Sequence, residues 1–276
     1  MAQMTISFDQ AASPTPPQKS RTGTARGYPP RQHVNEADAS WTRPLAGYDP
    51  PEYTADVVFQ HEGDWADPAD VKAVTRPFLT HTSHGDIAVP LDERGRPLNP
   101  IGRTGLQGRG LLGKWGRNPA GDSVLTRVNP ATGRLQVLLI ERKDSGQKAL
   151  PGGMVDEGED IATTVARELS EETGATLSFD AATTLFAGVV DDPRNTDHAW
   201  METTVLHQHL STREADAMTL QAGDDASAVQ WTDVDQRLVS SLYASHGDYL
   251  RLALQRLAKM PEIAPLVSDR SPTSVK

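Results

Sequence analysis

Three glutamates lie close together in the stretch RELSEETG, residues 167–174. Glu168, Glu171 and Glu172 stand at positions i, i+3 and i+4, so in a helix their carboxylates would share one face. Like charges at this spacing cost roughly 0.2 to 0.5 kcal/mol per pair. Such carboxylates can share a hard divalent cation such as Mg²⁺, which takes oxygen ligands and would cancel the repulsion. The alternative interpretation is an acidic helix face that is only solvated.

The spacing of the surrounding residues favours the first interpretation. Gly153 is followed six residues later by Glu159, and eight residues after that by Arg167. The segment fits the pattern G-x5-E-x7-R-E-U-x-E-E-x-G-U, where U is apolar and the small Ala175 takes the last position. With ordinary residue usage, its strict positions would match by chance about once in 10⁸ windows. The sequence therefore resembles the Nudix hydrolases over their whole signature.

The resemblance implies a metal site on this helix. In Nudix enzymes the ligands are usually the glutamates that match Glu168 and Glu172, with Glu171 assisting. The main-chain carbonyl of Gly153, at a bend where glycine permits a tight turn, can face the same metal. We expect Mg²⁺ as the cofactor, with Mn²⁺ as the alternative. The chain contains no cysteine, so any metal must be held by oxygen or histidine.

Two further residues of the signature have expected roles near the metal. Arg167 can pair with Glu159 and fix the orientation of the glutamates.

Two residues are candidates for the general base. One is Glu171, and the other is Asp225 in the AGDDA segment, which precedes an expected strand where related enzymes sometimes carry a catalytic acid. A solvated turn is the alternative interpretation for Asp225.

A second resemblance covers roughly residues 52–259. It rests on the segments GRTGLQGRGLLGKWGRN, ALPGGMVDEGE, DDPRNTDHAWMET, AGDDA and LYASH. These are similar to the mitochondrial-type ADP-ribose pyrophosphatases and to the homologous ADP-ribose-binding domain of melastatin TRP channels. The resemblance implies hydrolysis of ADP-ribose to AMP and ribose 5-phosphate. The alternatives are a Nudix hydrolase of another nucleoside diphosphate derivative, or a non-catalytic ADP-ribose sensor like the channel domains, whose helix has lost glutamates.

Substrate recognition is expected in DDPRNTDHAW, residues 191–200. By resemblance, Asp192, Arg194 and Asp197 contact the substrate; arginine suits phosphate, and aspartate suits ribose hydroxyls. His198 stands where relatives commonly have Asn. Tyr243 matches a ligand-contacting aromatic residue and could stack on adenine, with a half-buried core tyrosine as the alternative.

Alternating and helical apolar patterns predict the elements that position these residues. Strands are predicted at 123–128 and 135–142, joined by a turn at Pro-Ala-Thr-Gly, and at 184–190, 199–210 and 227–234. Leu135 to Ile140 is almost entirely aliphatic, as a strand buried on both faces would be. His207 and His209 are expected on an exposed strand face, because no third metal ligand is near in sequence.

Two helices complete the predicted catalytic domain. The first spans 160–173, and the second follows Ser245, which has capping-box spacing to Asp248. Strands and helices in this order indicate an α/β, or α+β layered, domain. The resemblance makes it a Nudix fold, with a mixed sheet sandwiched between helices and a smaller N-terminal domain.

Composition predicts the boundaries of the domains. Residues 1–51 hold eight prolines without apolar periodicity and read as a flexible arm, 52–117 as the small domain, 118–260 as the catalytic domain and 261–276 as a flexible tail. In the small domain we expect a short strand at TADVVF, residues 54–59. In the glycine-rich run 100–116 we expect turns and backbone crossings, with Arg103 and Arg109 solvated.

Charge and hydropathy limit the partners. Against 37 acidic residues there are 27 lysines and arginines, and the net charge of −10 argues against nucleic acid as a partner. No apolar run reaches the roughly 18 to 20 residues of a membrane span. We expect a monomer that acts on ADP-ribose or a similar nucleoside diphosphate compound in the cytoplasm. A mitochondrial location is the alternative, because the arm up to Gln32 has one acid against several basic residues.

Overall fold

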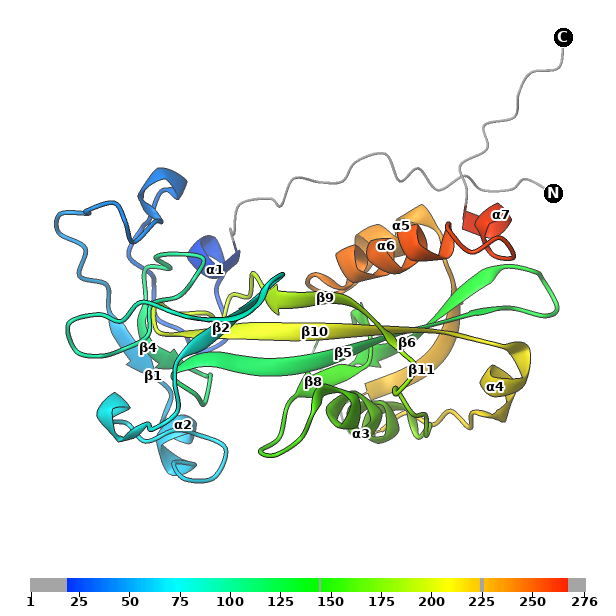
Figure 1. The fold of residues 1–276 in the computed structure, drawn as a ribbon, viewed down its shortest axis with the longest axis horizontal. Helices are drawn as coiled ribbons and strands as arrows, with labels where there is room; N and C mark the ends of the chain where they lie inside the picture. Colours follow the sequence, from blue (N-terminus) through cyan, green and yellow to red (C-terminus); the bar gives the residue numbers. More distant parts are fainter. Residues whose placement is uncertain (1–18, 144, 224–225, 268–276) are drawn as a thin grey trace, which may run out of the picture.

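The structure, a computed structural model, describes residues 19–143, 145–223 and 226–267. Within this part of the chain, a mixed seven-stranded sheet forms the centre (Figure 1). Its path runs β11-β6-β5-β10-β9, with β7 added to β6 and β8 added to β5. The strands are β5 (Gly116–Val128), β6 (Leu135–Arg142), β7 (Lys148–Ala149), β8 (Gly152–Met154), β9 (Thr183–Val189), β10 (Ala199–Leu210) and β11 (Ala226–Asp233). β5 and β10 are parallel along the whole of β10, and the other pairs are antiparallel.

Helices cover both faces of this sheet. Helix α3 (Ile161–Thr173) lies on one face, and α5 (Gln236–Ser241) and α6 (His246–Leu257) lie on the other (Figure 1). Successive residues of β6 pack in opposite directions, as expected for a strand. Val137 and Leu139 join a core cluster with Leu254 of α6, whereas Leu138 joins a second cluster with Leu169 of α3. The predicted layered α/β fold and the doubly buried strand are therefore confirmed.

The ends of the helices follow local capping chemistry. Asp160 caps α3, its carboxylate accepting a 2.8 Å hydrogen bond from the Thr163 amide, and Gly174 ends the helix with φ 70°. The predicted capping box at Ser245 is wrong, because that side chain makes no cap hydrogen bond. A capping box instead joins Ser211 and Glu214 at α4 (Thr212–Ala217). The Ser-x-x-Glu spacing there was the better signal.

The end of the described chain also differs from expectation. Residues after 260 were predicted as a flexible tail, but α7 (Ala264–Val267) follows α6 closely. Ile263 and Val267 are buried in the same core cluster as Leu254 and Leu257. These two apolar side chains pack the short segment against α6.

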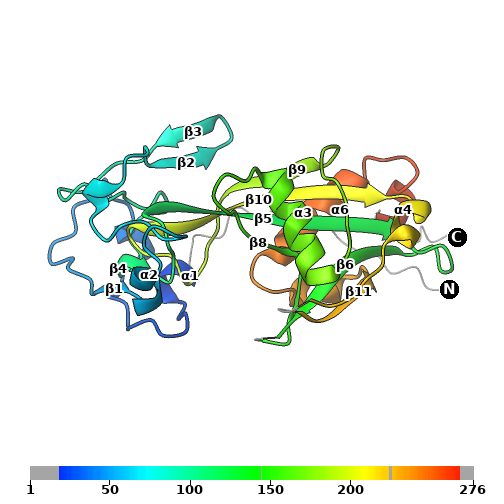
Figure 2. The ribbon, with the colours of Figure 1, turned by 90° about the horizontal axis from the view of Figure 1, so that it is seen from below.

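The N-terminal part is built from short elements around the starts of β5 and β10 (Figures 1 and 2). These are α1 (Lys19–Thr22), η1 (Glu36–Asp38), β1 (Glu52–Thr54), α2 (Asp56–Gln60), η2 (Val71–Ala73), β2 (Leu79–Thr82), β3 (Gly85–Ala88) and β4 (Gln107–Gly110). The predicted strand TADVVF is wrong, because β1 ends at Thr54 and α2 begins at Asp56. Val58 is fully buried while Val57 and Phe59 are exposed, and the strand propensity of the valines does not decide the local structure.

Residues 19–51 differ from the flexible arm that their proline content predicted. The Trp41 indole donates to the Asn99 carbonyl at 2.8 Å, and the Tyr48 hydroxyl donates to Asp197 at 2.7 Å. Tyr28 and Val34 are buried. Most of these contacts are made by single polar side chains with distant backbone or carboxylate groups. They therefore leave no periodic pattern in the sequence.

The glycine-rich run consists of close backbone crossings, as predicted. A Cβ at Gly105 would lie 2.0 Å from the Gln32 carbonyl oxygen, and one at Gly108 would lie 2.4 Å from that of Tyr53. Both glycines also have a positive φ, which side chains disfavour.

The expectation that Arg103 and Arg109 are solvated is wrong. Arg103 is 7% exposed and donates to the carbonyls of Asp38, Ser40 and Arg43 at 2.6 to 3.0 Å. Arg109 is fully buried; it donates to the carbonyls of Asp67 and Gly113 and pairs with Glu62 at 3.3 Å. Each guanidinium meets several carbonyl acceptors at once, which satisfies a buried charge in a region poor in apolar side chains.

The expected exposed face at His207 and His209 is also wrong. His207 is 3% exposed, and its Nε2 lies 3.0 Å from the Thr126 hydroxyl. His209 is half-buried and reaches the same hydroxyl at 2.9 Å. Burial, with smaller effects of Arg256 and His209, lowers the pKa of His207 to about 4.

We expect His207 to make the fold acid-sensitive. Its pKa is about 4 in the folded protein and takes the ordinary histidine value of 6.5 in the unfolded chain, so between these values the unfolded state binds a proton that the native state excludes. The free energy of unfolding should therefore fall as the pH drops from 6.5 towards 4, by up to about 1.4 kcal/mol per pH unit for this group. Urea unfolding from pH 7 to 5 measures the slope. His207→Gln should reduce it, and the exposed control His84→Gln should not; equal slopes would contradict the assignment.

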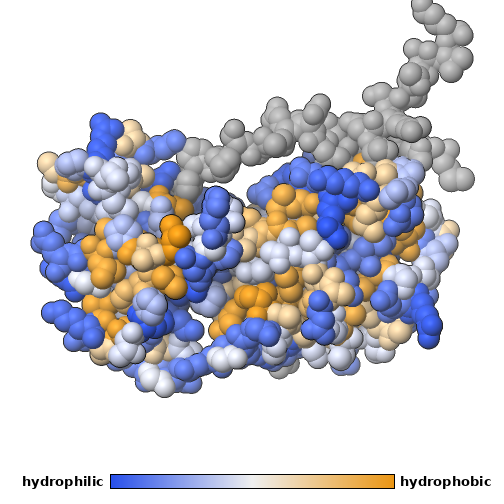
Figure 3. All heavy atoms as spheres, in the orientation of Figure 1, coloured by the Kyte–Doolittle hydropathy of each residue, from blue (hydrophilic) through white to orange (hydrophobic). Residues whose placement is uncertain are grey.

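Of the helices in the described ranges, none is long and apolar enough to span a bilayer. On the face shown in Figure 3, hydrophobic residues appear in separate areas divided by hydrophilic ones.

Candidate active site

Arg167 organises the acidic face of α3. Its Nε and Nη2 atoms bind the two oxygens of Glu159 at 2.9 and 3.0 Å, which is the predicted pairing. Its Nη1 atom donates to Glu168 at 2.8 Å and to Glu171 at 3.1 Å, and Nη2 also donates to the Met154 carbonyl at 3.0 Å. The hydrogen bonds from Arg167 are the main cause that lowers the pKa of Glu159 to about 2. One guanidinium therefore joins β8, the loop before α3 and two glutamates of the helix.

Two glycines bring β8 directly against the other side of this cluster. The amide of Gly152 donates to Glu172 Oε2 at 3.0 Å. A Cβ at Gly153 would lie 2.4 Å from the carboxyl carbon and Oε1 of Glu168. Only a residue without a side chain leaves room for the glutamate there, so the sequence pattern Gly-Gly and the helix carboxylates form one unit.

Burial disfavours the charged forms of the two inner glutamates, Glu168 and Glu172. Burial raises the pKa of Glu172 to about 8, with further contributions from the Glu168 and Asp122 carboxylates. Burial also raises the pKa of Glu168. Adjacent, half-buried carboxylates of this kind fit the oxygen preference of a hard divalent cation. In the described residues, however, no group of three or more His, Asp or Glu side chains is arranged as a ready-made metal cluster.

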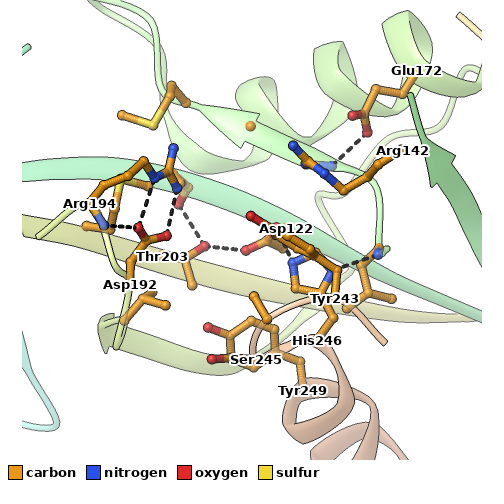
Figure 4. A pocket seen from close by; sticks show the side chains of 18 residues that line it. Asp122, Arg142, Glu172, Asp192, Arg194, Thr203, Tyr243, Ser245, His246 and Tyr249 are labelled. Atoms are coloured by element: carbon orange, nitrogen blue, oxygen red, sulfur yellow. Dashed lines mark hydrogen bonds and ion pairs between the residues drawn. The ribbon is translucent and has the colours of Figure 1, made fainter. Parts of the chain in front are cut away.

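A cavity of about 790 Å³, including its open mouth, lies next to Glu172 (Figure 4). Its walls come from segments that are far apart in the sequence. β5 contributes Ala120 and Asp122, and its parallel neighbour β10 contributes Met201 and Thr203. The remaining sides are formed by Leu150 to Met154, by the loop after β9, and by residues 243–246 and 249 at the start of α6.

A polar network crosses the middle of the cavity (Figure 4). The Thr203 hydroxyl donates to Asp122 Oδ2 at 2.6 Å, and Asp122 Oδ1 lies 3.9 Å from His246 Nε2. The Leu150 amide donates to His246 Nδ1 at 2.8 Å, so the ring proton of neutral His246 is on Nε2. Burial lowers the pKa of His246. Sequence reasoning missed Asp122, Thr203 and His246, although an acid at the edge of an apolar strand was a visible signal.

Three predicted substrate residues line the cavity. Arg194 binds Asp192 through two parallel hydrogen bonds, 2.9 Å from Nε and 2.8 Å from Nη2. Asp192 holds Arg194 charged, raising its pKa against the opposing effect of burial. Tyr243 is half-buried, and the Arg142 guanidinium lies 4.5 Å from the centre of its ring. Tyr243 packs against a core cluster on one side and faces the cavity on the other.

Other predicted residues are not brought to this cavity. Asp197 is 1% exposed and accepts hydrogen bonds from the Tyr48 hydroxyl at 2.7 Å and from the amide and hydroxyl of Thr104 at 2.7 and 2.9 Å. Burial raises its pKa to about 6. The expected contact of Asp197 with substrate is therefore corrected: its carboxylate is buried in the contact between the 191–197 loop and the N-terminal part.

The structure does not place three further residues considered in the sequence analysis at the cavity. The Glu171 side chain is 59% exposed, bonds to Arg167 and does not line the cavity. Asp225 lies outside the described residues. His198 is buried and bonds to the Pro97 carbonyl at 3.1 Å, away from the cavity.

Backbone strain marks the cavity wall beside α6. Within the described ranges, Ala244 is the one non-glycine residue with a positive φ, at 47°. It turns the chain between Tyr243 and Ser245, so that Tyr243 and His246 both reach the cavity. Strain of this kind costs of order 1 kcal/mol or more and is concentrated at functional sites.

Comparison with known proteins agrees with this geometry. Residues 119–253 match the family model of the NUDIX domain, and residues 34–116 match that of the NUDT9-like N-terminal domain. The chain is 39% identical to the mitochondrial ADP-ribose pyrophosphatase of Rattus norvegicus, over 82% of this chain and 74% of the relative. It is 39% identical to putative nudix hydrolase 6 of Caenorhabditis elegans, over 80% of this chain and 89% of the relative.

A third relative is a channel. The transient receptor potential cation channel subfamily M member-like 2 of Nematostella vectensis is 37% identical over 84% of this chain, which corresponds to 17% of the channel. The signature on α3, the cavity beside it and these matches lead to one conclusion: the chain belongs to the Nudix hydrolase family, with an N-terminal domain of the NUDT9-like type.

Proposed function

We propose that this chain hydrolyses the diphosphate of ADP-ribose to AMP and ribose 5-phosphate. The observation that carries the proposal is the position of Glu172, one of the signature glutamates, on the wall of a cavity that Arg194 and Tyr243 also line (Figure 4). The name of the rat relative supports the choice of substrate. Because Glu168, Glu171 and Glu172 are all present, an enzyme is favoured over a non-catalytic sensor.

Different residues that line the cavity would bind different parts of the substrate. Arg194 would bind a phosphate of the substrate, and Asp192, whose two oxygens both face Arg194, would hold the guanidinium in place. The exposed face of Tyr243 is suited to stacking on adenine. Hydrolysis forms a bond from the water oxygen to one phosphorus and breaks that phosphorus's bond to the bridging oxygen. Glu171 and Asp225 are the two candidates to accept the proton of the water.

Nudix hydrolases act with divalent metal ions, and the inner glutamates fit one. Glu168 and Glu172, assisted by Glu171 and the Gly153 carbonyl, would hold the ion, and we propose Mg²⁺ with Mn²⁺ as the alternative. When bound, the ion neutralises phosphate charge and makes a coordinated water more acidic. The closeness of Glu168 to Gly153 and of Glu172 to Gly152, with pKa values that burial raises, supports this assignment.

Incubation with a panel of nucleoside diphosphate compounds in ¹⁸O-labelled water tests the proposal. The panel contains ADP-ribose, a nucleotide sugar and a dinucleotide, each with Mg²⁺. We expect ADP-ribose to be hydrolysed with the highest kcat/KM, and mass analysis of AMP and ribose 5-phosphate to place the label in one product. A preference for another compound would overturn the substrate. Absence of hydrolysis throughout, with binding of ADP-ribose retained, would indicate a sensor.

Arg194→Ala is expected to raise KM by roughly 10- to 100-fold, because one or two charge-assisted hydrogen bonds to phosphate are lost. The value of kcat should change much less. A matched control is Arg76→Ala, which removes an arginine that binds Asp67 at 2.8 and 2.7 Å with similar exposure, but far from the cavity in the N-terminal part. Steady-state kinetics decide the question, and an unchanged KM would take Arg194 out of the site.

A further inference from the structure

The loop that carries Arg194 is held from outside the cavity by the N-terminal segment. Arg31 is half-buried, and its Nη2 atom donates to the carbonyls of Pro193 at 2.5 Å and Asn195 at 2.9 Å. These two carbonyls flank Arg194 on either side. The same guanidinium reaches the Thr104 carbonyl at 3.2 Å and the Gly23 carbonyl at 3.4 Å. A single side chain therefore joins the loop to two segments of the N-terminal part.

The remaining carbonyl of this stretch is held by Tyr28. Its hydroxyl donates to the carbonyl of Arg194 itself at 2.8 Å and accepts from the Leu111 amide at 2.8 Å. Tyr28 is 9% exposed, and the Arg31 guanidinium lies 5.8 Å from the centre of its ring. Three consecutive carbonyls, of Pro193, Arg194 and Asn195, are thus bound by two adjacent side chains of the N-terminal segment.

Helix α1 adds a contact at the start of the loop. The amides of Lys19 and Ser20 donate to the two carboxylate oxygens of Asp191, each at 2.9 Å. A Cβ at Gly23 would lie 2.9 Å from Cβ of Pro193, so this segment packs directly on the loop. None of Lys19, Tyr28 and Arg31 lines the cavity.

We propose that Arg31 and Tyr28 are positioning residues that fix the backbone of Arg194 so that its side chain enters the cavity in a binding geometry. The proposal rests on the function proposed above and deepens it, because it assigns substrate affinity to residues that do not touch the substrate. Asp192 orients the guanidinium inside the cavity, while Arg31 and Tyr28 fix the chain behind it. Preordering of this kind lowers the conformational cost of binding.

The test compares Arg31→Met with a matched control, Arg103→Met. Arg103 is a buried arginine that likewise binds carbonyls of the N-terminal part, but its side-chain hydrogen bonds go to Asp38, Ser40 and Arg43 and not to residues 191–197. We expect Arg31→Met to raise KM for ADP-ribose about tenfold with kcat nearly unchanged, since displacement of a binding group acts on affinity. Arg103→Met should lower the melting temperature by a comparable amount and leave KM unchanged. Equal KM values for Arg31→Met and wild type, or equal increases in both variants, would overturn the proposal.

Two additional measurements separate positioning from general destabilisation. Because Arg31 is proposed to act through Arg194, Arg31→Met should have little further effect on KM in an Arg194→Ala background. Hydrogen exchange of residues 191–197 should be faster in Arg31→Met and in Tyr28→Phe, and unchanged in Arg103→Met. Tyr28→Phe removes one hydroxyl and keeps the ring, so it serves if Arg31→Met fails to fold.

The outcomes also distinguish this proposal from the proposed function. If the wild-type protein hydrolyses no compound of the panel, the proposed function fails, and loop exchange together with the dissociation constant for ADP-ribose then decides the role of Arg31. If the protein hydrolyses ADP-ribose but loop exchange and KM are unchanged in Arg31→Met, only the positioning role fails.

Discussion

Replacing Glu172 with glutamine is expected to lower kcat by at least about a thousandfold, or more than roughly 4 kcal/mol of transition-state stabilisation. The amide keeps the shape of the side chain and can still contact the Gly152 amide, but it carries no negative charge for a cation. The stability of the folded protein, in contrast, should not decrease. Because burial disfavours the charged carboxylate, the glutamine variant should unfold at the same temperature as the metal-free wild type or at a higher one.

Kinetics and thermal unfolding on the same samples check this prediction. Glu157→Gln, an exposed acid in the loop before α3, is the control and should retain full activity. A Glu172→Gln variant that hydrolyses substrate at the wild-type rate would remove Glu172 from the site. A variant that loses activity together with its fold would show that the carboxylate is needed for structure.

Gly153→Ala is expected to lower kcat by roughly a hundredfold with little loss of stability. The new Cβ would lie 2.4 to 2.6 Å from the carboxyl group of Glu168, so the end of a flexible side chain must move. Moving it is cheap for the fold, but it takes Glu168 from its place beside Arg167, and a displacement of about 1 Å at a reacting centre can cost about 10²-fold in rate.

The neighbouring glycine provides the contrast. A Cβ at Gly152 would lie 2.4 Å from the Gly121 carbonyl and 2.8 Å from Cα of Asp122, both backbone atoms that cannot turn away. Gly152→Ala should therefore destabilise the protein first, by roughly 1 to 3 kcal/mol, because the backbone must shift to make room. Chemical unfolding and kcat measured for both variants separate the two effects. If Gly153→Ala remained fully active, the close fit between Gly153 and Glu168 would have no catalytic meaning.

The features that could be predicted from the sequence are those that depend on contacts between residues close together along the chain. Helix α3 and the Glu159–Arg167 pair depend on residues within a few turns of one another, and both were predicted correctly. The bounds of β10 were also correct, because twelve residues of strand-forming type stand without a break.

The remaining features depend on partners far away in the sequence. Asp122 and Thr203 meet only because β5 and β10 lie side by side, which no periodicity reveals. Arg31, Arg103 and Arg109 bind backbone carbonyls, and every residue has a carbonyl, so the sequence gives no sign of which ones are chosen. The Pro-rich composition of residues 19–51 was misleading for the same reason.

The parallel pairing of β5 with β10 has a consequence for synthesis on the ribosome. β5 leaves the exit tunnel with its β6 hairpin partner, but its long parallel neighbour is translated only after α3 and β9 have followed. Until then one edge of the future central strand is unpaired, and the 191–197 loop on which the N-terminal segment closes does not yet exist. Nascent chains shorter than about residue 210 should thus depend on chaperones, because their unpaired strand edge is open to incorrect pairing.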